Sequence, residues 1–162
     1  MGEDHEVVFV VAEDVRAARR AAKAKWGGDG RPHVDALTRL DSPPLSTSEL
    51  RAPGGAYVVG YEGTEAVAGG GVRRLADGVA EIKRMYVRPD ARSRGVARAL
   101  LAALEASASA LGYETVRLDT GPKQVHALAL YRSAGYVDVA PYNDNPFACF
   151  WGEKRLDPTH LS

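Results

Sequence analysis

The segment from Arg92 to Ala97 is the part of this sequence whose residue types and spacing are best suited to bind an anion. It lies between a strand pattern that ends at Val87 and the start of a long amphipathic helix pattern. The start of a helix offers backbone N–H groups without internal partners, together with the positive end of the helix dipole. Because Gly95 has no Cβ, a diphosphate can approach the backbone closely there. The segment therefore predicts a diphosphate site.

Three arginines, Arg92, Arg94 and Arg98, add positive charge and bidentate donors to this site. The alternative is an ordinary surface helix, but arginine in a first turn opposes the helix dipole. Other phosphate-binding motifs fit less well, because the chain lacks GxxxxGK[ST] and a GxGxxG that follows a strand. The glycines 69–71 fall inside a strand pattern, where close packing or a bulge is typical. The residues of the predicted site are Arg92, Ser93, Arg94, Gly95, Val96, Ala97 and Arg98.

The elements that must position this turn follow a mixed pattern of strands and helices. Period-2 and β-branched patterns predict strands, whereas apolar residues at helical spacing predict helices. The irregular segment 27–54 contains four prolines and is expected to be a surface connection. This order predicts an α/β domain with a mixed sheet and helices on both faces. We expect strands over residues 7–11, 56–61, 67–75, 79–87, 115–118, 136–139 and 147–154, and helices over 14–26, 94–111 and 126–134.

Length and composition narrow the classes of function. A chain of 162 residues is the size of one domain, here 1–162, and its zero net charge disfavours a nucleic-acid binder. Cys149 is the only cysteine, which excludes an internal disulfide and a multi-cysteine zinc site, and we expect it to be buried. The acidic N-terminus does not resemble a signal peptide, and no apolar run approaches the ~20 residues of a membrane helix. These features predict a cytoplasmic protein without a metal site.

Three segments together resemble the GNAT acetyltransferase superfamily. Arg92–Ala97 resembles the family's [Q/R]-x-x-G-x-[G/A] signature, and Glu81–Val87 resembles its fourth strand. Leu128–Tyr136, with the letters LALYRSAGY, is similar to the helix end A-x-x-L-Y-x-x-x-G-[F/Y]. The resemblance covers residues 56–154 well and the first 55 residues only in outline. It implies a mostly antiparallel sheet that is splayed between its fourth and fifth strands.

The resemblance also implies how a donor, acetyl-CoA, is bound. Pantetheine would lie in the splay along the backbone of Met85, Tyr86 and Val87, while the turn around Gly95 would hold the pyrophosphate. Gln124 stands where the family often has asparagine, and its longer amide is the corresponding cofactor contact that the resemblance implies. The function implied is N-acetylation of a primary amine in a ternary complex. The alternative is a binding module of the same fold that has lost the chemistry.

Two residues are candidates for proton transfer in such a reaction. Tyr131 resembles the tyrosine that many family members place near the thioester sulfur, and its phenol can donate a proton to the leaving thiolate at neutral pH. Glu81 is the candidate base, although it could instead be a salt-bridged strand residue, and a water relay is the rival. Strand alternation predicts that Glu81 shares one face with Lys83, Met85 and Val87.

The acceptor site is expected near the end of the next strand and in a later loop. Asp119 and Thr120 either line the amine pocket or form a turn before Gly121. Tyr142 and Asn143 belong to a polar turn that either borders the acceptor or is an ordinary loop. The segment 27–54 is the expected variable acceptor side. The sequence does not identify the amine, beyond a small molecule or peptide, and it allows a monomer or a homodimer.

Overall fold

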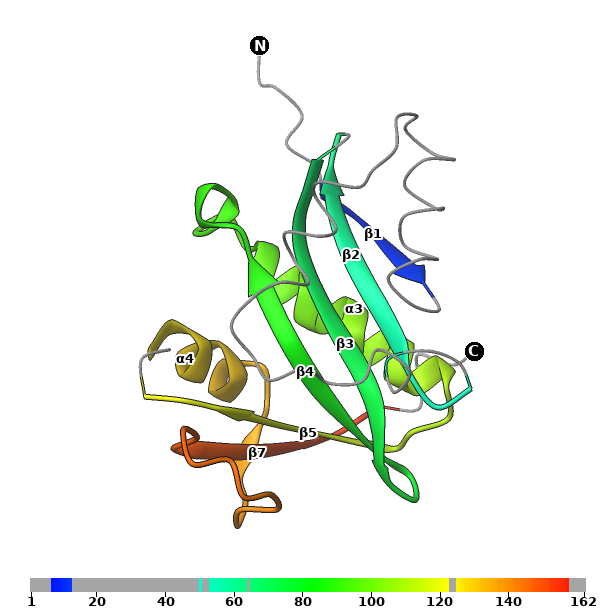
Figure 1. Cartoon of the computed structure of the whole chain (residues 1–162), viewed down its shortest axis with the longest axis vertical. Coiled ribbons are helices and arrows are strands. Elements are labelled where there is room, and N and C mark those ends of the chain that lie inside the picture. The colour runs from blue at the N-terminus through cyan, green and yellow to red at the C-terminus, as the bar shows by residue number, and fades with distance from the viewer. Residues whose placement is uncertain (1–6, 13–49, 51–52, 64, 123–124, 158–162) are drawn as a thin grey trace.

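A seven-stranded sheet is the frame of the described part of the chain. The computed structural model describes residues 7–12, 50, 53–63, 65–122 and 125–157 (Figure 1). The strand order is β1-β2-β3-β4-β5-β7-β6, and neighbours are antiparallel except for the parallel pair β4 and β5. The prediction of a mixed, mostly antiparallel sheet is therefore confirmed. The elements are β1 (Val7–Ala12), β2 (Ala56–Glu62), β3 (Glu65–Ala76), β4 (Val79–Val87), the short 3₁₀ helix η2 (Pro89–Ala91), α3 (Val96–Ala110), β5 (Thr115–Thr120), α4 (Val125–Ser133), β6 (Val137–Asp138) and β7 (Phe150–Arg155).

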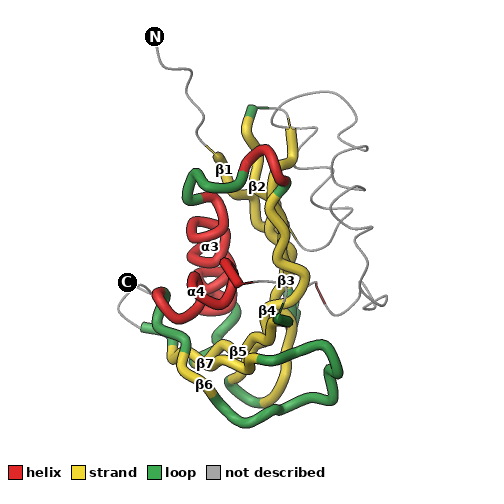
Figure 2. Tube along the Cα trace, turned by 90° about the vertical axis from the view of Figure 1, so that its left-hand side faces the viewer, coloured by secondary structure: helices red, strands yellow, loops and turns green. Residues whose placement is uncertain are grey.

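Helices α3 and α4 lie on the same side of the sheet (Figure 2). The apolar stripe of α3 is buried as its periodicity predicts, with Val96, Leu100 and Leu104 facing the strands. Neither helix is long and apolar enough to cross a membrane, nor is any other described helix. The helix expected over residues 14–26 and most of the segment 27–54 lie outside the described residues.

The glycines of β3 permit close packing on both faces of the sheet. A Cβ on Gly70 would lie 2.9 Å from Leu104 of α3, and one on Gly71 would lie 2.6 Å from Leu50 on the opposite face. Such distances are shorter than normal contacts between carbon atoms. The expectation of close packing at these glycines, instead of a phosphate motif, is consistent with this geometry.

A bulge in β4 changes which side chains share a face. Gly69 pairs with Tyr86 but Gly71 pairs with Lys83, so β4 has one residue more than β3 in this interval. The extra residue is absorbed around Arg84, whose φ is 57°. Met85 consequently faces α3 beside Gly70.

The expected alternation along β4 is therefore wrong. Glu81 pairs with Arg73, which lies on the Gly71 face, so Glu81 and Lys83 point away from α3. Val87 is buried with the α3 core. Glu81 and Lys83, before the bulge, therefore lie on one face of the sheet, and Met85 and Val87, after it, lie on the α3 face.

The splay between β4 and β5 is confirmed by their register. The two strands pair only at Val79–Thr115, Ala80–Val116 and Glu81–Arg117. Beyond this point β4 continues to Val87 and β5 to Thr120, and the strands diverge (Figure 1). The stretch of β4 that is not paired with β5 leads through η2 to the turn before α3.

Candidate functional site

The turn before α3 is an open helix N-terminus. Gly95 is the N-cap residue, has a left-handed φ of 77°, and follows Ser93, whose φ is 65°. The first helical hydrogen bond runs from the N–H of Ala99 to the carbonyl of Gly95 at 3.1 Å, so the N–H groups before it have no partner within the helix. The cap has no side-chain hydrogen bond, and no acidic residue lies in the first turn.

The geometry at Gly95 fits the predicted diphosphate. A Cβ there would meet no atom within 4 Å, so the side-chain position is open. Any side chain would enter the space that an anion needs to reach the backbone N–H groups. An anion could therefore approach the backbone N–H groups of this turn.

The three arginines around the turn contact protein groups. Their side chains are exposed and hold neighbouring elements together. A guanidinium has five N–H donors, so each arginine could keep its present contact and still bind a phosphate. The contacts are Arg92 Nε to the Val87 carbonyl at 2.9 Å, Arg94 to Glu62 at 2.7 Å and Arg98 to Ser133 Oγ at 2.6 Å.

Tyr131 extends from α4 to the splayed edge of β4. Its side chain is buried, its ring packs edge-on to Tyr136 at 5.9 Å, and its hydroxyl lies 3.8 Å from Met85 Sδ. Burial, and secondarily the negative charge of Asp119, raises the pKa of Tyr131 to about 12. The hydroxyl is therefore a proton donor throughout the neutral range. It lies beside Met85, the residue expected to contact pantetheine.

Buried tyrosines predict a specific loss of stability at high pH. Burial raises the pKa of Tyr57, Tyr61 and Tyr131 to about 12, whereas tyrosines in an unfolded chain titrate near pH ~10. The stabilisation from their protonated forms is complete below pH ~10 and is lost as the pH rises through ~12. We expect tyrosinate absorbance and loss of circular dichroism to increase together across this interval. Titration of these tyrosines near pH ~10 with the fold intact would contradict this.

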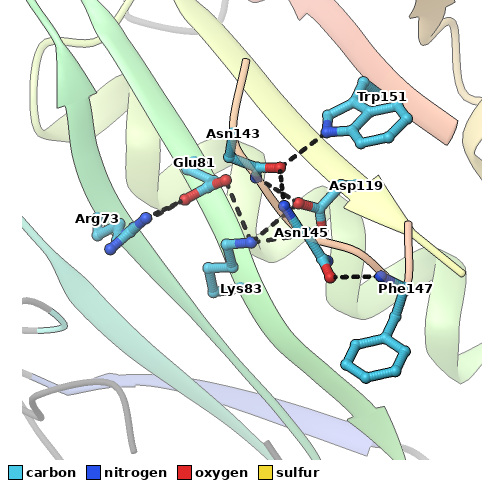
Figure 3. Close-up of polar contacts among 8 residues, drawn as sticks. All are labelled: Arg73, Glu81, Lys83, Asp119, Asn143, Asn145, Phe147 and Trp151. Carbon is cyan, nitrogen blue, oxygen red and sulfur yellow. Dashed lines mark hydrogen bonds and ion pairs between the residues drawn. The ribbon is translucent and has the colours of Figure 1, made fainter. Parts of the chain in front are cut away.

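A polar cluster lies on the face of the sheet that points away from α3, where β4 and β5 separate (Figure 3). Glu81 is fully buried and accepts a hydrogen bond from Arg73 at 2.7 Å, while Lys83 lies 3.2 Å from its second oxygen. Lys83 also lies 3.2 Å from Asp119 of β5, and this contact crosses the splay. The polar cluster comprises Arg73, Glu81, Lys83, Asp119, Asn143 and Trp151.

The loop between β6 and β7 is fastened to this cluster through Asn143. Its side-chain amide donates to Asp119 at 2.6 Å, and its carbonyl oxygen accepts from Trp151 Nε1 at 2.9 Å and from the Asn145 N–H at 3.2 Å. The Asn145 side chain in turn accepts from the N–H of Phe147 at 3.0 Å. These bonds give the loop a defined shape beside the splay.

The structure brings together three of the four residues expected at the acceptor. Asp119 and Asn143 bond directly, and the half-buried Tyr142 packs against Arg117, the residue that pairs with Glu81. Burial, and then the charge of Glu81, raises the pKa of Tyr142. Thr120 is buried on the opposite face of β5 from Asp119. Gln124 lies outside the described residues.

Arg73 and Trp151 are members of this region that the sequence did not predict, whereas Asn145 lies in the predicted polar turn. The prediction that Cys149 is buried is wrong, because the chain before Phe150 is a loop rather than a strand and Cys149 is exposed. Within the described ranges, no three His, Cys, Asp or Glu side chains are grouped closely enough to hold a metal ion.

Replacing Glu81 by glutamine is expected to lower the free energy of unfolding by about 2–3 kcal/mol, because Arg73 and Lys83 would lose their shared counter-charge. The side chains of these two cations are 23% and 19% exposed, so water would compensate part of the loss. Urea denaturation measures the change. The control is Glu153→Gln, whose ion pair with Arg117 is 32% exposed on both sides and should contribute below about 1 kcal/mol. Equal losses in the two variants would contradict the buried role of Glu81.

Comparisons with known proteins agree with this fold. A sequence model of the acetyltransferase (GNAT) family matches residues 10–136. An IAA acetyltransferase of Azospirillum brasilense is 40% identical over 82 residues, 49% of this chain and 53% of that protein, so the match spans about half of that relative. The uncharacterised N-acetyltransferase YjgM of Escherichia coli K12 is 36% identical over 141 residues, 85% of this chain and 78% of that protein. A crystal structure of a presumed acyl-CoA N-acyltransferase from Klebsiella pneumoniae has a TM-score of 0.68 at 29% identity, and the match covers 95% of this chain and 100% of that one.

Proposed function

This chain belongs to the acetyltransferase (GNAT) family, and from that premise we propose that it transfers an acetyl group from acetyl-CoA to a primary amine of a small molecule or peptide. The observation that carries the proposal is the open, left-handed turn at Gly95, which follows directly on the splayed edge of β4. The turn at Gly95 suits a diphosphate, and the edge of β4 that is not paired with β5 suits an extended chain of amides. A ligand that has both groups would therefore fit the two features together. Coenzyme A has both, and it supplies the acyl group as a thioester.

The residues that would hold the donor come from two adjacent segments. Backbone N–H groups of the turn from Ser93 to Arg98 would bind the diphosphate, and the exposed arginines would add charge at its margin. The backbone of Met85, Tyr86 and Val87 would bind the pantetheine amides along the splay. Arg92 contacts the Val87 carbonyl at 2.9 Å, so its side chain joins the two segments.

Tyr131 would provide the proton for the leaving sulfur. Its hydroxyl lies next to Met85, on the edge of β4 that pantetheine would follow. Because burial keeps the hydroxyl protonated, it can donate at neutral pH without a prior proton transfer. The ring is fixed by its packing on Tyr136, which favours a constant direction of donation.

Glu81 was the candidate base for removing a proton from the amine, but its contacts do not favour this role. Both carboxylate oxygens of Glu81 already contact cations, Arg73 at 2.7 Å and Lys83 at 3.2 Å. Both oxygens are thus occupied by cations, so an amine would have to displace one of them to reach Glu81. This arrangement favours the water relay, or another carboxylate, over Glu81.

Release of free thiol from acetyl-CoA in the presence of primary amines tests the proposed function. Acetyl-CoA at a hundred times its dissociation constant should first stabilise the protein by about 2.7 kcal/mol, measured by thermal denaturation. A panel of small amines and peptides should then include at least one that releases thiol in proportion to acetylated product. Stabilisation without turnover on any amine would support the non-catalytic binding module instead. Absence of stabilisation would overturn both.

A further inference from the structure

Lys83 holds a primary ammonium group between two carboxylates at the point where the sheet splits. Its Nζ lies 3.2 Å from Glu81 Oε2, and 3.2 and 3.4 Å from the two oxygens of Asp119. The last backbone pair between the strands is Glu81–Arg117, so this ion pair crosses the gap where the backbone pairing has ended (Figure 3). The site therefore already accommodates the functional group that the acceptor would present.

The two carboxylates differ in how firmly they are fixed. Glu81 is fully buried and is bound by Arg73 at 2.7 Å in addition to Lys83. Asp119 has an 8% exposed side chain, contacts Lys83 at 3.2 and 3.4 Å, and has one neutral donor, Asn143, at 2.6 Å. An incoming ammonium group can replace Lys83 at Asp119 without leaving Asn143 unpaired, whereas Glu81 stays held by Arg73.

Asp119 is also the carboxylate whose negative charge acts on Tyr131. Its negative charge contributes to the raised pKa of Tyr131, although the two side chains start from different elements. Asp119 therefore lies within electrostatic reach of the hydroxyl that would protonate the sulfur. Asn143, fixed in turn by Trp151 at 2.9 Å, holds the Asp119 carboxylate in one orientation.

Resting on the proposed function, we propose that Asp119 binds the acceptor's ammonium group in the place that Lys83 occupies in the free protein, and then removes its proton. One proton passes from the ammonium group to the Asp119 carboxylate. The neutral nitrogen then bonds to the acyl carbon as the carbon–sulfur bond breaks, and the sulfur takes a proton from Tyr131. The second proton lost by nitrogen restores Tyr131, and the proton on Asp119 leaves to solvent. Ammonium and thioester thus give amide, thiol and one proton.

Both cations and anions lie near Asp119, where it would bind and deprotonate the ammonium group. Two cations, Arg73 and Lys83, balance two carboxylates, Glu81 and Asp119, so the net charge of this group depends on whether Lys83 remains in place. Lys83 contacts this carboxylate, whose charge acts on Tyr131 and Tyr142. Glu81 and Arg117 contact or act on these neighbours, and Arg73 contacts Glu81.

Chemical rescue of Lys83→Ala by n-propylammonium tests the ammonium site without any donor. This ion has the atoms that the substitution removes. Compared with sodium chloride at equal ionic strength, it should raise the melting temperature of Lys83→Ala by roughly 3–6 °C at ten times its dissociation constant. The rise should be lost in Lys83→Ala/Asp119→Asn. It should persist in Lys83→Ala/Asp138→Asn, because Asp138 is an exposed carboxylate paired with Arg132 elsewhere.

Acetyl-CoA added to the rescued protein tests the chemistry. We expect N-propylacetamide, detected by mass spectrometry, from Lys83→Ala and at least a tenfold loss of it when Asp119 is also replaced. Rescue that does not depend on Asp119, or dependent rescue without product, would overturn the assignment. If Lys83→Ala does not fold in either salt, Lys83→Ser is tested in the same way. Failure of the proposed function itself would show separately, as wild-type protein that neither binds acetyl-CoA nor releases thiol.

Discussion

Replacing Tyr131 by phenylalanine is expected to lower kcat by roughly 10²- to 10⁴-fold, the contribution usual for a positioned general acid. The dissociation constant for acetyl-CoA should change by less than about threefold, because only an interaction with the reacting group is removed. The protein should also keep its stability, since the hydroxyl makes only a weak 3.8 Å contact to Met85 Sδ. Steady-state kinetics and calorimetric titration measure these quantities on the same preparation.

Tyr136→Phe is the matched control for this variant. Tyr136 is buried beside Tyr131, and its hydroxyl donates to Glu105 at 2.8 Å. Its removal should therefore cost about 1 kcal/mol of stability and leave kcat nearly unchanged. The two variants should show opposite patterns, one in rate and one in stability. An unchanged kcat in Tyr131→Phe would remove Tyr131 from the mechanism.

Replacing Gly95 by aspartate is expected to weaken acetyl-CoA binding by at least about 100-fold while the protein remains folded. The new carboxylate would enter the open space above the turn and repel a diphosphate from the N–H groups of α3. The left-handed φ of 77° imposes about 1–2 kcal/mol of strain on a residue with a Cβ. An acidic residue at a helix N-terminus returns about 0.3–1 kcal/mol of this. Calorimetric titration and urea denaturation separate the two effects.

Gly78→Asp controls for strain and charge together. Gly78 has a φ of 71° in the β3–β4 hairpin, and a Cβ there also meets nothing within 4 Å. The substitution therefore adds the same charge and a similar strain away from α3. It should leave the affinity for acetyl-CoA unchanged. If both variants bound acetyl-CoA equally weakly, general electrostatics rather than the turn would explain the loss.

The helices and strands could be predicted from the sequence wherever a local residue pattern determines where an element begins or which face is buried. The apolar stripe of α3 identified its buried face, and the glycine turn identified its start. The strands expected over 67–75 and 79–87 placed the boundary between β3 and β4 correctly. These features depend on neighbours in the chain, so local propensity and periodicity are sufficient to predict them.

The polar cluster could not be predicted, because two bulges shift its register. A regular hairpin around a two-residue turn would place Arg74 opposite Glu81. The irregularity between Arg74 and Ala76 instead pairs Glu81 with Arg73. The second bulge, at Arg84, turns Met85 to the face opposite Glu81. A bulge moves side chains between faces without a distinct mark in the sequence.

The contacts of Asp119 depend on segments far apart in the chain. Lys83 comes from β4, while Asn143 and Trp151 come from the loop before β7 and from β7 itself. A polar loop between two prolines gave no sequence signal that its asparagine would be fixed by an indole N–H. Such pairings follow from the strand order, which places β7 beside β5.

Calorimetric titration of the wild type and Gly95→Asp, each with coenzyme A and with pantetheine, tests the central claim that the turn at Gly95 holds the diphosphate. Pantetheine carries the chain that would follow β4 but lacks the diphosphate. We predict that the substitution weakens binding of coenzyme A by at least about 100-fold and leaves the affinity for pantetheine unchanged. Equal weakening of both ligands, or an unchanged affinity for coenzyme A, would contradict the placement of the diphosphate at this turn.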